Sequence, residues 1–232
     1  MKNFFVMSVL IISAASMASS HAFATGTAPN LGASSTFGIL ANTYTNSGVG
    51  TSITGNLGYT VAPANPPTVI GKIFKATDAT YIAAESSQAK AITFANTPSL
   101  SGACTTTITP ATVLDSLKQP LKPGVYCIAG AVSINKAVTL SGNGVYIFRI
   151  GGAINTVANS AVHLTNGAMA NKVFWVPIGA TTLGTHSLFS GNILSNASIT
   201  AENSVVMSGR ILSDGAVTTS PYDAIRVPSV HR

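Results

Sequence analysis

The chain contains the stretch Ser190-Gly191-Asn192-Ile193-Leu194-Ser195, which recurs as Ser208-Gly209-Arg210-Ile211-Leu212-Ser213 about 18 residues later. A period of this length fits one coil of a β-solenoid, in which two or three short strands are joined by tight corners. A solenoid stacks equivalent residues of successive coils into ladders. The repeat therefore predicts a mainly β fold that is wound as a solenoid and carries columns of like residues on its outer faces.

Small, threonine-rich steps end several short apolar runs around this repeat. They are Ala137-Val138-Thr139-Leu140, Ala153-Ile154-Asn155-Thr156, Ala180-Thr181-Thr182-Leu183, Ala197-Ser198-Ile199-Thr200 and Gly215-Ala216-Val217-Thr218. Stacking would align the steps on one outer face, and this column is the first candidate for a functional surface. Strand alternation predicts that Ile199 points into the core while Ser198 and Thr200 point outward. The simpler alternative is that Thr, Ser, Asn and Gly are ordinary strand and corner residues of a β-solenoid.

The first 24 residues are typical of a signal peptide. Lys2 supplies a positive charge, residues 4–12 are apolar, and Ala22-Phe23-Ala24 forms a small-x-small cleavage site. The apolar run is too short to span a bilayer, and no later stretch is long and apolar enough to do so. We therefore expect residues 25–232 to be secreted as a single domain, to the extracellular space or the periplasm.

The composition is unusually poor in charge. Only 8% of the residues are charged, against roughly 25% in typical soluble domains. The net charge of +6 comes from cations that are scattered singly along the chain. Because no basic run with interleaved aromatic residues occurs, we expect no nucleic-acid partner. A basic amphipathic helix is also absent from the sequence, so we expect no membrane partner.

The two cysteines, Cys104 and Cys127, lie in the same stretch of the chain. An even number of cysteines in an exported protein favours a disulfide. Such a bond would close a loop of about two dozen residues and contribute about 3 kcal/mol to stability. Two free buried thiols are the alternative. Neither cysteine has a histidine or second cysteine at ligand spacing, so no metal site is expected.

Residues 77–96 have the periodicity of a helix, which Thr77 or Asp78 can cap. Its apolar stripe is interrupted by one polar residue and consists of Tyr81, Ala84, Gln88, Ala91 and Ala95, with Ile82, Ala89 and Ile92 beside it. A single stripe on a lone helix must be buried against another element. The helix is therefore predicted to lie along a flank of the solenoid.

The remaining segments are predicted to extend or close the solenoid. Residues 31–61 are typical of short strands, and residues 37–46 resemble residues 191–200, which predicts a coil distant in sequence from the others. Residues 62–67 form a proline-rich connector. Residues 99–127 contain three prolines and both cysteines. We interpret them as an irregular cap over an open sheet edge.

The sequence does not favour an enzyme. Glycoside hydrolysis uses two cooperating carboxylates, and the nearest candidates, Glu202 and Asp214, are predicted at corners where solvated residues are common. His163 and His186 are isolated, and no serine has the glycine context of a nucleophile elbow. Trp175 lies in an apolar strand and is predicted to be a core residue. Nothing indicates a cofactor, and none is expected.

Several motifs resemble those of a known family. They are Leu31-Gly32, Phe37-Gly38-Ile39-Leu40-Ala41, Thr54-Gly55-Asn56-Leu57-Gly58, Leu121-Lys122-Pro123-Gly124-Val125-Tyr126, Val145-Tyr146-Ile147-Phe148-Arg149-Ile150-Gly151 and Asn171-Lys172-Val173-Phe174-Trp175-Val176, followed by the two coils quoted above. In this order they resemble the secreted ice-binding, or antifreeze, proteins of the DUF3494 type. The resemblance implies a discontinuous right-handed β-helix of triangular section with a long helix alongside. It also implies an N-terminal coil inserted among C-terminal ones, and a Cys104–Cys127 disulfide in the cap.

The same resemblance implies a function. A protein of this family adsorbs to an ice crystal surface through a flat Thr/Ser/Ala-rich face, which gives thermal hysteresis and inhibits ice recrystallisation. We expect a monomer. The residues that match such a face are Thr43, Thr45, Thr182, Ser198, Thr200 and Thr218, with Thr139 and Thr156 as neighbours. The alternative is a secreted adhesion or carbohydrate-binding module, for which Tyr44 and Tyr59 are the candidate outward-facing aromatic residues.

Overall fold

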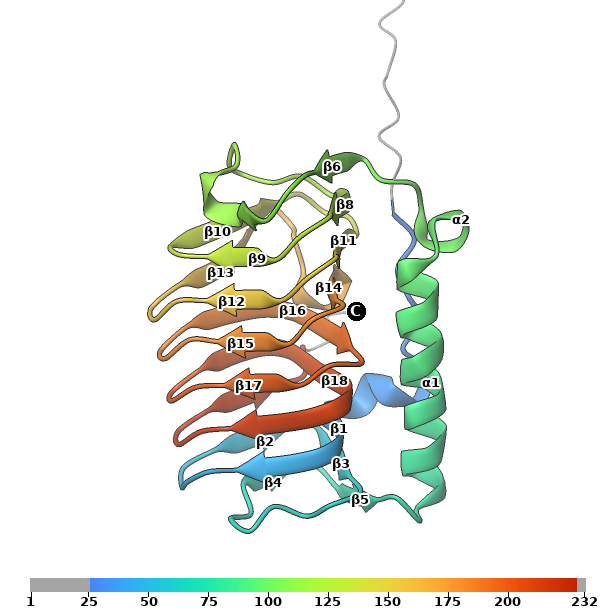
Figure 1. The fold of residues 1–232 in the computed structure, drawn as a ribbon. Helices are drawn as coiled ribbons and strands as arrows, with labels where there is room; N and C mark the ends of the chain where they lie inside the picture. Colours follow the sequence, from blue (N-terminus) through green and yellow to red (C-terminus); the bar gives the residue numbers. More distant parts are fainter. Residues whose placement is uncertain (1–25, 229–232) are drawn as a thin grey trace, which may run out of the picture.

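The computed structural model describes residues 26–228. The predicted signal peptide, residues 1–24, lies outside the described residues. Parallel strands are stacked in coils, and a long helix stands beside the stack (Figure 1). All 19 strands of the described residues belong to one continuous sheet. The predicted β-solenoid with a flanking helix is therefore confirmed.

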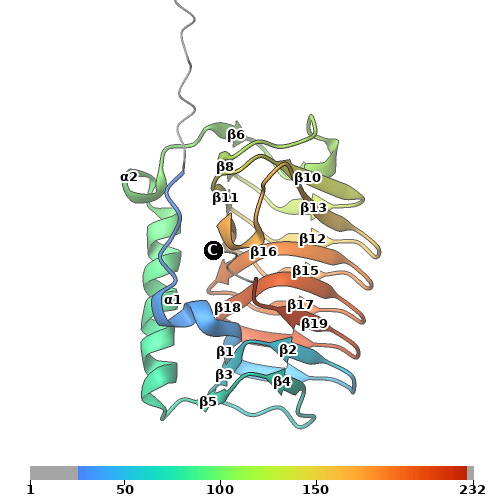
Figure 2. The same cartoon turned by 180° about the vertical axis from the view of Figure 1, so that it is seen from behind.

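Strand pairing divides the solenoid into three faces, which gives the triangular section. The helix-covered face contains β6 (Thr106–Ile108), β8 (Gly124–Ile128), β11 (Tyr146–Ile150), β14 (Val173–Pro177), the end of β16 (Leu188–Ser195), the middle of β18 (Val206–Thr219), the start of β1 (Phe37–Asn46), β3 (Asn56–Tyr59) and β5 (Ile73–Lys75). The threonine face contains β7 (Thr112–Val113), β9 (Val132–Ile134), β12 (Ile154–Thr156), β15 (Thr181–Leu183), β17 (Ile199–Ala201) and the ends of β18 and β1. The rear face contains β10 (Ala137–Ser141), β13 (Ala161–Thr165), the starts of β16 and β18, β19 (Ala224–Arg226), β2 (Ser52–Thr54) and β4 (Thr68–Ile70) (Figure 2).

The core fills the space between the three faces. Each strand directs alternate residues inward, as the pleat requires, and these residues form apolar columns. Aromatic rings stack along the axis in the upper coils, where Phe148 lies 4.9 Å from Tyr126 and 4.1 Å from Trp175 between ring centroids. Trp175 is fully buried, so the prediction that it is a core residue is confirmed.

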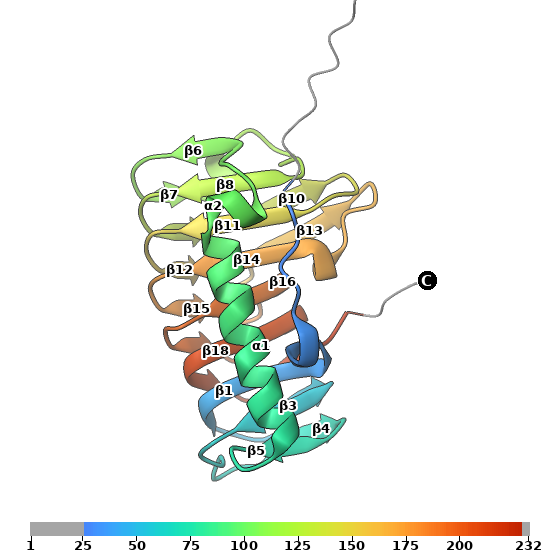
Figure 3. The same cartoon turned by 90° about the vertical axis from the view of Figure 1, so that its right-hand side faces the viewer.

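Helix α1 (Ala79–Asn96) runs the length of the helix-covered face (Figure 3). Its buried residues are Tyr81, Ala84, Gln88, Ala91, Ile92 and Ala95, which confirms the predicted stripe except for its flanking residues Ile82 and Ala89, which are exposed. Opposite them lie the outward-facing apolar residues of the strands, Leu40, Val125, Ile147, Phe174, Val176, Leu194 and Leu212. Gln88 is buried and donates a hydrogen bond to Asp214, so the polar gap in the stripe meets a polar partner. Asp78 occupies the N-cap position but makes no side-chain cap bond.

The N-terminal coils extend the stack instead of interrupting it. The resemblance implied that they are inserted among C-terminal coils, and the structure corrects this. Strand β1 pairs with β18 on one side and with β3 on the other, while β2 lies between β19 and β4. The chain thus starts in mid-stack, winds to one end, returns along α1 and winds back to its starting point. Parallel pairing of β1 with β18 closes the seam between the first and last coils.

The segment predicted as an irregular cap is more regular than expected. Residues 99–127 contain the end of α2 (Pro98–Ser101), strands β6 and β7, the 3-10 helix η2 (Leu114–Ser116) and most of β8. They form the terminal coil of the stack. Two further 3-10 turns, η1 (Gly32–Thr36) and η3 (Ala170–Lys172), lead into strands β1 and β14 of the helix-covered face.

One corner repeats the same backbone conformation in successive coils. Where the threonine face turns into the rear face, Asn159, His186, Ser204 and Tyr222 have φ of 61°, 57°, 61° and 64°. The N–H of each bonds a carbonyl of the next coil, such as His186 to Asn203 and Ser204 to Pro221. L-residues adopt this left-handed region at a cost of about 1–2 kcal/mol. The hydrogen bonds that these four N–H groups make to the next coil offset that cost and hold the corner sharp.

Candidate functional site

The threonine face carries an outward ladder in register. Backbone pairing places Thr182 beside Thr200, Thr200 beside Thr218, and Thr218 beside Thr45. The ladder continues toward the cap through Asn155, Ser133 and Val113. Strands β9, β12, β15 and β17 lie one below another in Figure 1. Four threonines therefore repeat at the spacing of neighbouring strands, about 4.8 Å.

A second outward column lies two residues before the first. Its members are small, namely Ala131, Ala153, Ala180, Ser198, Ala216 and Thr43, and the last two are paired directly. The two columns are separated by two residues along each strand, about 6.7 Å. None of the residues in either column is charged. The face thus combines one column of threonines with one of small side chains.

The residues between the two columns hold the threonines in place. Ile199, Val217 and Tyr44 point inward with at most 1% of their surfaces exposed. This confirms that Ile199 is inside, while Ser198 is exposed and Thr200 is partly exposed. Threonine is β-branched and stiff at χ1. A regular backbone and restricted side chains therefore give the face a fixed array of hydroxyl and methyl groups.

The structure corrects the position of Thr156, one of the predicted face residues. Thr156 is only 6% exposed, and its Oγ1 accepts a hydrogen bond of 2.8 Å from the Gly184 N–H. Asn155, the residue before it, is exposed and takes the ladder position beside Thr182. The prediction was out of register by one residue, which in a strand exchanges the inner and outer sides.

Thr139, the second predicted neighbour, lies on the rear face instead. It pairs with His163 of β13, and its strand β10 takes no part in the threonine face. The other six predicted residues, Thr43, Thr45, Thr182, Ser198, Thr200 and Thr218, do lie together on that face. The sequence reasoning missed Ser133 and Asn155. A shared small–apolar–polar step, Ala131-Val132-Ser133 and Ala153-Ile154-Asn155, is the signal that would have found them.

Tyr44 and Tyr59 are not the outward-facing aromatic residues that a sugar-binding surface would need. They are 1% and 7% exposed, and their rings stack 6.4 Å apart inside the core. The Tyr44 hydroxyl lies 2.7 Å from Thr219 Oγ1, which in turn hydrogen-bonds Asn46 at 3.1 Å. Burial raises the pKa of Tyr44 to about 12. Tyr44 therefore links β1 to β18, and the ring of Tyr59 in β3 stacks on it.

Asp223 is a buried carboxyl close to the same seam. Its two oxygens accept hydrogen bonds of 2.8 Å from the backbone N–H groups of Val205 and Ser220. Those bonds favour the charged form, but burial outweighs them and raises the pKa of Asp223 to about 7. Asp223 connects the corner after β18 to the one before it, away from the outer surface.

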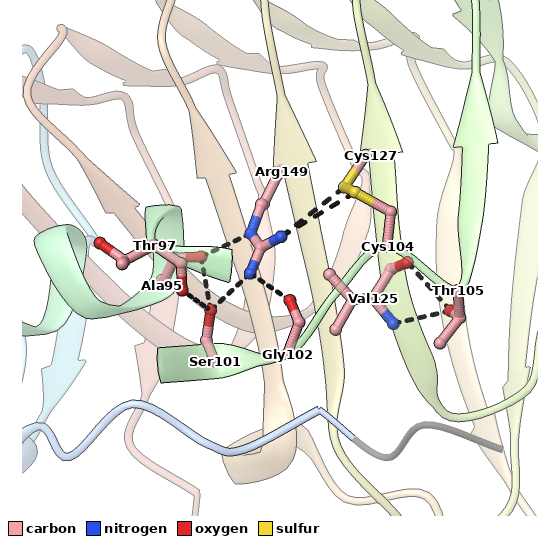
Figure 4. The surroundings of a disulfide bond; sticks show 9 residues. All are labelled: Ala95, Thr97, Ser101, Gly102, Cys104, Thr105, Val125, Cys127 and Arg149. Carbon is pink, nitrogen blue, oxygen red and sulfur yellow. Dashed lines mark hydrogen bonds between the residues drawn. A yellow bond between two sulfur atoms is a disulfide. The ribbon is translucent and has the colours of Figure 1, made fainter. Parts of the chain in front are cut away.

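The predicted disulfide is present and lies on a different face from the ladder. Cys104 and Cys127 are bonded, with a Cα–Cα distance of 5.7 Å, on the helix-covered face (Figure 4). The neighbouring Arg149 donates from Nε to Ala95 O at 2.7 Å, and from Nη2 to Ser101 Oγ and Gly102 O. The disulfide and Arg149 thus fasten the first solenoid coils to the end of α1.

No cluster of three or more His, Cys, Asp or Glu side chains in residues 26–228 could hold a metal ion. No helix among these residues is long and apolar enough to cross a membrane.

The fold and face define a class of protein. It is a β-solenoid that carries an uncharged, in-register ladder of threonines on one outer face. Residues 32–222 match the model of the ice-binding-like family. The chain belongs to this family, as its motifs indicated.

Individual relatives agree with the family match. An ice-binding protein of Nostoc sp. (strain HG1) is 33% identical over 198 residues, which cover 81% of this chain and 70% of the relative. One of Colwellia sp. is 39% identical over 100 residues, or 42% of this chain and 40% of the relative. The structure also resembles the crystal structure of an ice-binding protein from Antarctomyces psychrotrophicus, with a TM-score of 0.79 and 30% sequence identity. The match covers 88% of this chain and 100% of the Antarctomyces chain.

Proposed function

We propose that the protein adsorbs to ice through the threonine face. The observation that carries this proposal is the in-register ladder Thr182–Thr200–Thr218–Thr45 beside a column of small residues. Membership of a family of ice-binding proteins supports it. Adsorbed protein would pin the crystal front, which gives thermal hysteresis and inhibits recrystallisation.

Water can be ordered over such an array because the array is regular in two directions. The hydroxyl of each threonine anchors a water molecule, while its methyl group leaves neighbouring water few alternative partners. The small column lets a layer of water approach the backbone between the ladders. Stiff side chains lose little rotamer entropy on docking. Long charged side chains would hold disordered hydration above the plane, and the two columns contain none.

The four threonine coils form the centre of the proposed contact. Toward the cap the ladder changes to Asn155, Ser133 and Val113, and these break the repetition of hydroxyl and methyl groups. We therefore assign the strongest contact to β15, β17 and the ends of β18 and β1. Substitutions at Thr200 and Thr218 should consequently affect binding more than substitutions at Ser133.

The substitution Thr200→Tyr tests the proposal. Its ring would project above the face, so that the neighbouring side chains could no longer reach a rigid ice surface. Thermal hysteresis and ice affinity should fall sharply, while the melting temperature hardly changes, because surface substitutions usually alter stability by less than about 0.5 kcal/mol. Both should be measured on purified protein, by watching crystal growth under a microscope and by partition into growing ice.

A matched control comes from Thr139, which is also partly exposed and outward-facing but lies on the rear face. Thr139→Tyr should retain full activity. Loss of activity in Thr139→Tyr with none in Thr200→Tyr would place ice binding on the rear face. Full activity in Thr200→Tyr and Thr182→Tyr would refute the threonine face as the binding surface.

We also infer that the protein acts outside the cytoplasm as a single chain. The signal-peptide pattern of residues 1–24 and a disulfide both support export, and one chain supplies the whole ladder. Expression with the native leader should yield protein in the periplasm or medium whose N-terminal residue is Thr25. A full-length cytoplasmic product with free thiols would contradict the inference.

A further inference from the structure

An apolar groove lies beside the disulfide, at the edge where the helix-covered face turns into the threonine face. Its volume is about 300 Å³, the lower end of the range for small-molecule sites. The end of α1 and its following turn form one wall, the disulfide forms another, and the ends of β8 and β11 form the floor. The residues used below are Cys104, Cys127, Ala129, Arg149, Gly151 and Ile178.

Along the open side of the groove, the residues that follow the helix-covered strands change from apolar to polar down the stack. In the upper coils the residues that follow the helix-covered strands are Ala129, Gly151 and Ile178. In the two coils below, Asn196 and Asp214 follow the equivalent strands. Ile178 is 72% exposed, a high value for a large apolar side chain. The exposed apolar side chains along this edge are thus found beside the groove and not in the two coils below it.

Arg149 brings a positive charge to this apolar site. The side chain is 9% exposed, and the oxygen atoms that it contacts, Ala95 O, Gly102 O and Ser101 Oγ, are all neutral. Its Nη1 faces only the disulfide, at 3.7 Å from Cys127 Sγ and 4.0 Å from Cys104 Sγ (Figure 4). Sulfur is a weak acceptor. By contrast, Nη1 of the other buried arginine, Arg210, donates to Asn192 Oδ1 at 2.8 Å.

We propose that this groove binds a monocarboxylate with an alkyl chain, such as a medium-chain fatty acid. The carboxylate meets Nη1 of Arg149, and the chain lies along Ala129, Gly151 and Ile178. A single negative charge matches the guanidinium of Arg149, because the partners that it bonds include no carboxylate. An apolar wall matches the chain and disfavours a hydrated phosphate. A charge-assisted bond to a partly desolvated guanidinium is stronger than one between neutral groups.

Octanoate and octanol distinguish charge recognition from simple partition into an apolar groove. Calorimetric titration of the purified protein should show saturable, one-to-one binding of octanoate at least about tenfold tighter than that of octanol. Each methylene that is buried contributes about 0.8 kcal/mol, so affinity should rise about fourfold per methylene from butanoate to octanoate. Equal affinity for octanoate and octanol, or no binding of octanoate, would overturn the proposal.

The variant Ile178→Glu tests the location without touching the buried network. It replaces an exposed apolar wall with a negative charge, so octanoate affinity should fall at least tenfold with an unchanged melting temperature. Val49→Glu is the matched control, since Val49 is 71% exposed at the opposite edge of the threonine face. Its octanoate affinity should equal that of the unmodified protein. Unchanged binding in Ile178→Glu would refute this site.

Arg149→Met completes the test, although it also removes bonds to α1 and lowers stability. The informative quantity is the ratio of octanoate to octanol affinity at a temperature where the variant is folded. That ratio should fall to about one, whereas a purely structural role for Arg149 would change both affinities together. Octanoate binding is measured without ice, so its outcome tests the groove whatever the ice affinity of the variant.

Discussion

The threonine face and the rear face are both built from stacked parallel strands, share strand β18, and differ in their side chains. Strand β18 contributes Ser208 to the rear face and Thr218 to the threonine face. The rear column that contains Ser208 reads Ser190, Ser208, Arg226 and Thr54, whereas the ladder around Thr218 reads Thr182, Thr200, Thr218 and Thr45. Both have parallel backbones with the same strand spacing. The comparison teaches that the solenoid supplies a regular lattice on both faces, while the choice of side chain distinguishes the proposed ice-binding face from the rear face.

A charge placed on each face should give the largest difference. Thr218→Lys puts a long, hydrated side chain with about 2 kcal/mol of rotamer entropy into the ladder, so thermal hysteresis should be almost abolished. Ser208→Lys, in the same strand, should leave it unchanged. Both variants should melt within a few degrees of the parent protein. Equal losses in the two variants would mean that net charge, and not the face, controls activity.

The buried carboxyl of Asp223, beside the seam between β1 and β18, should make the stability of the protein depend on pH. The pKa of Asp223 rises from 3.8 to about 7 on folding, so its protonated form is favoured in the folded state. Its contribution is complete below about pH 4 and is lost as the pH rises toward 7, by at most about 4 kcal/mol. Urea unfolding between pH 4 and 8 should show this decline, and Asp223→Asn should flatten it. The same slope in the Asn variant would rule out Asp223 as its source.

Reduction of the disulfide should affect the stack but not the ladder. The bond joins residues 23 apart, and removing it should cost about 3 kcal/mol on the chain-entropy account. Cys104→Ser with Cys127→Ser should therefore lower the melting temperature while ice affinity near 0 °C is retained. A parallel loss of ice affinity in protein that is still folded would show that the cap end supports the face.

The left-handed corner that joins the two faces should give the smallest effect. Ser204 has a φ of 61°, a conformation that a β-branched residue adopts poorly. Ser204→Val should destabilise the protein by about 1–2 kcal/mol, whereas Ser204→Gly should be close to neutral. Glu202→Val serves as the control, because Glu202 lies near the same corner but is not one of the residues with a positive φ. An equal loss in the Glu202 and Ser204 variants would point to exposed apolar surface instead of backbone strain.

The sequence by itself determined the repeated coil, the flanking helix and the cysteine pair. These depend on local periodicity, because the 18-residue recurrence, the stripe from Tyr81 to Ala95 and the cysteine count can each be recognised without knowing distant contacts. Gly191 and Gly209 show why the repeat is so strict. A Cβ on Gly209 would lie 1.7 Å from Gly191 O, so stacking requires glycine there.

Only the tertiary structure decided which face each step belongs to. Ala137-Val138-Thr139 and Ala216-Val217-Thr218 look alike, yet they lie on different faces, because corner positions depend on how each coil stacks on its neighbours. Thr156 is buried and Asn155 exposed because one residue of register reverses a strand. Arg149 likewise joins groups distant in sequence, Ala95 and the disulfide, which only folding brings together.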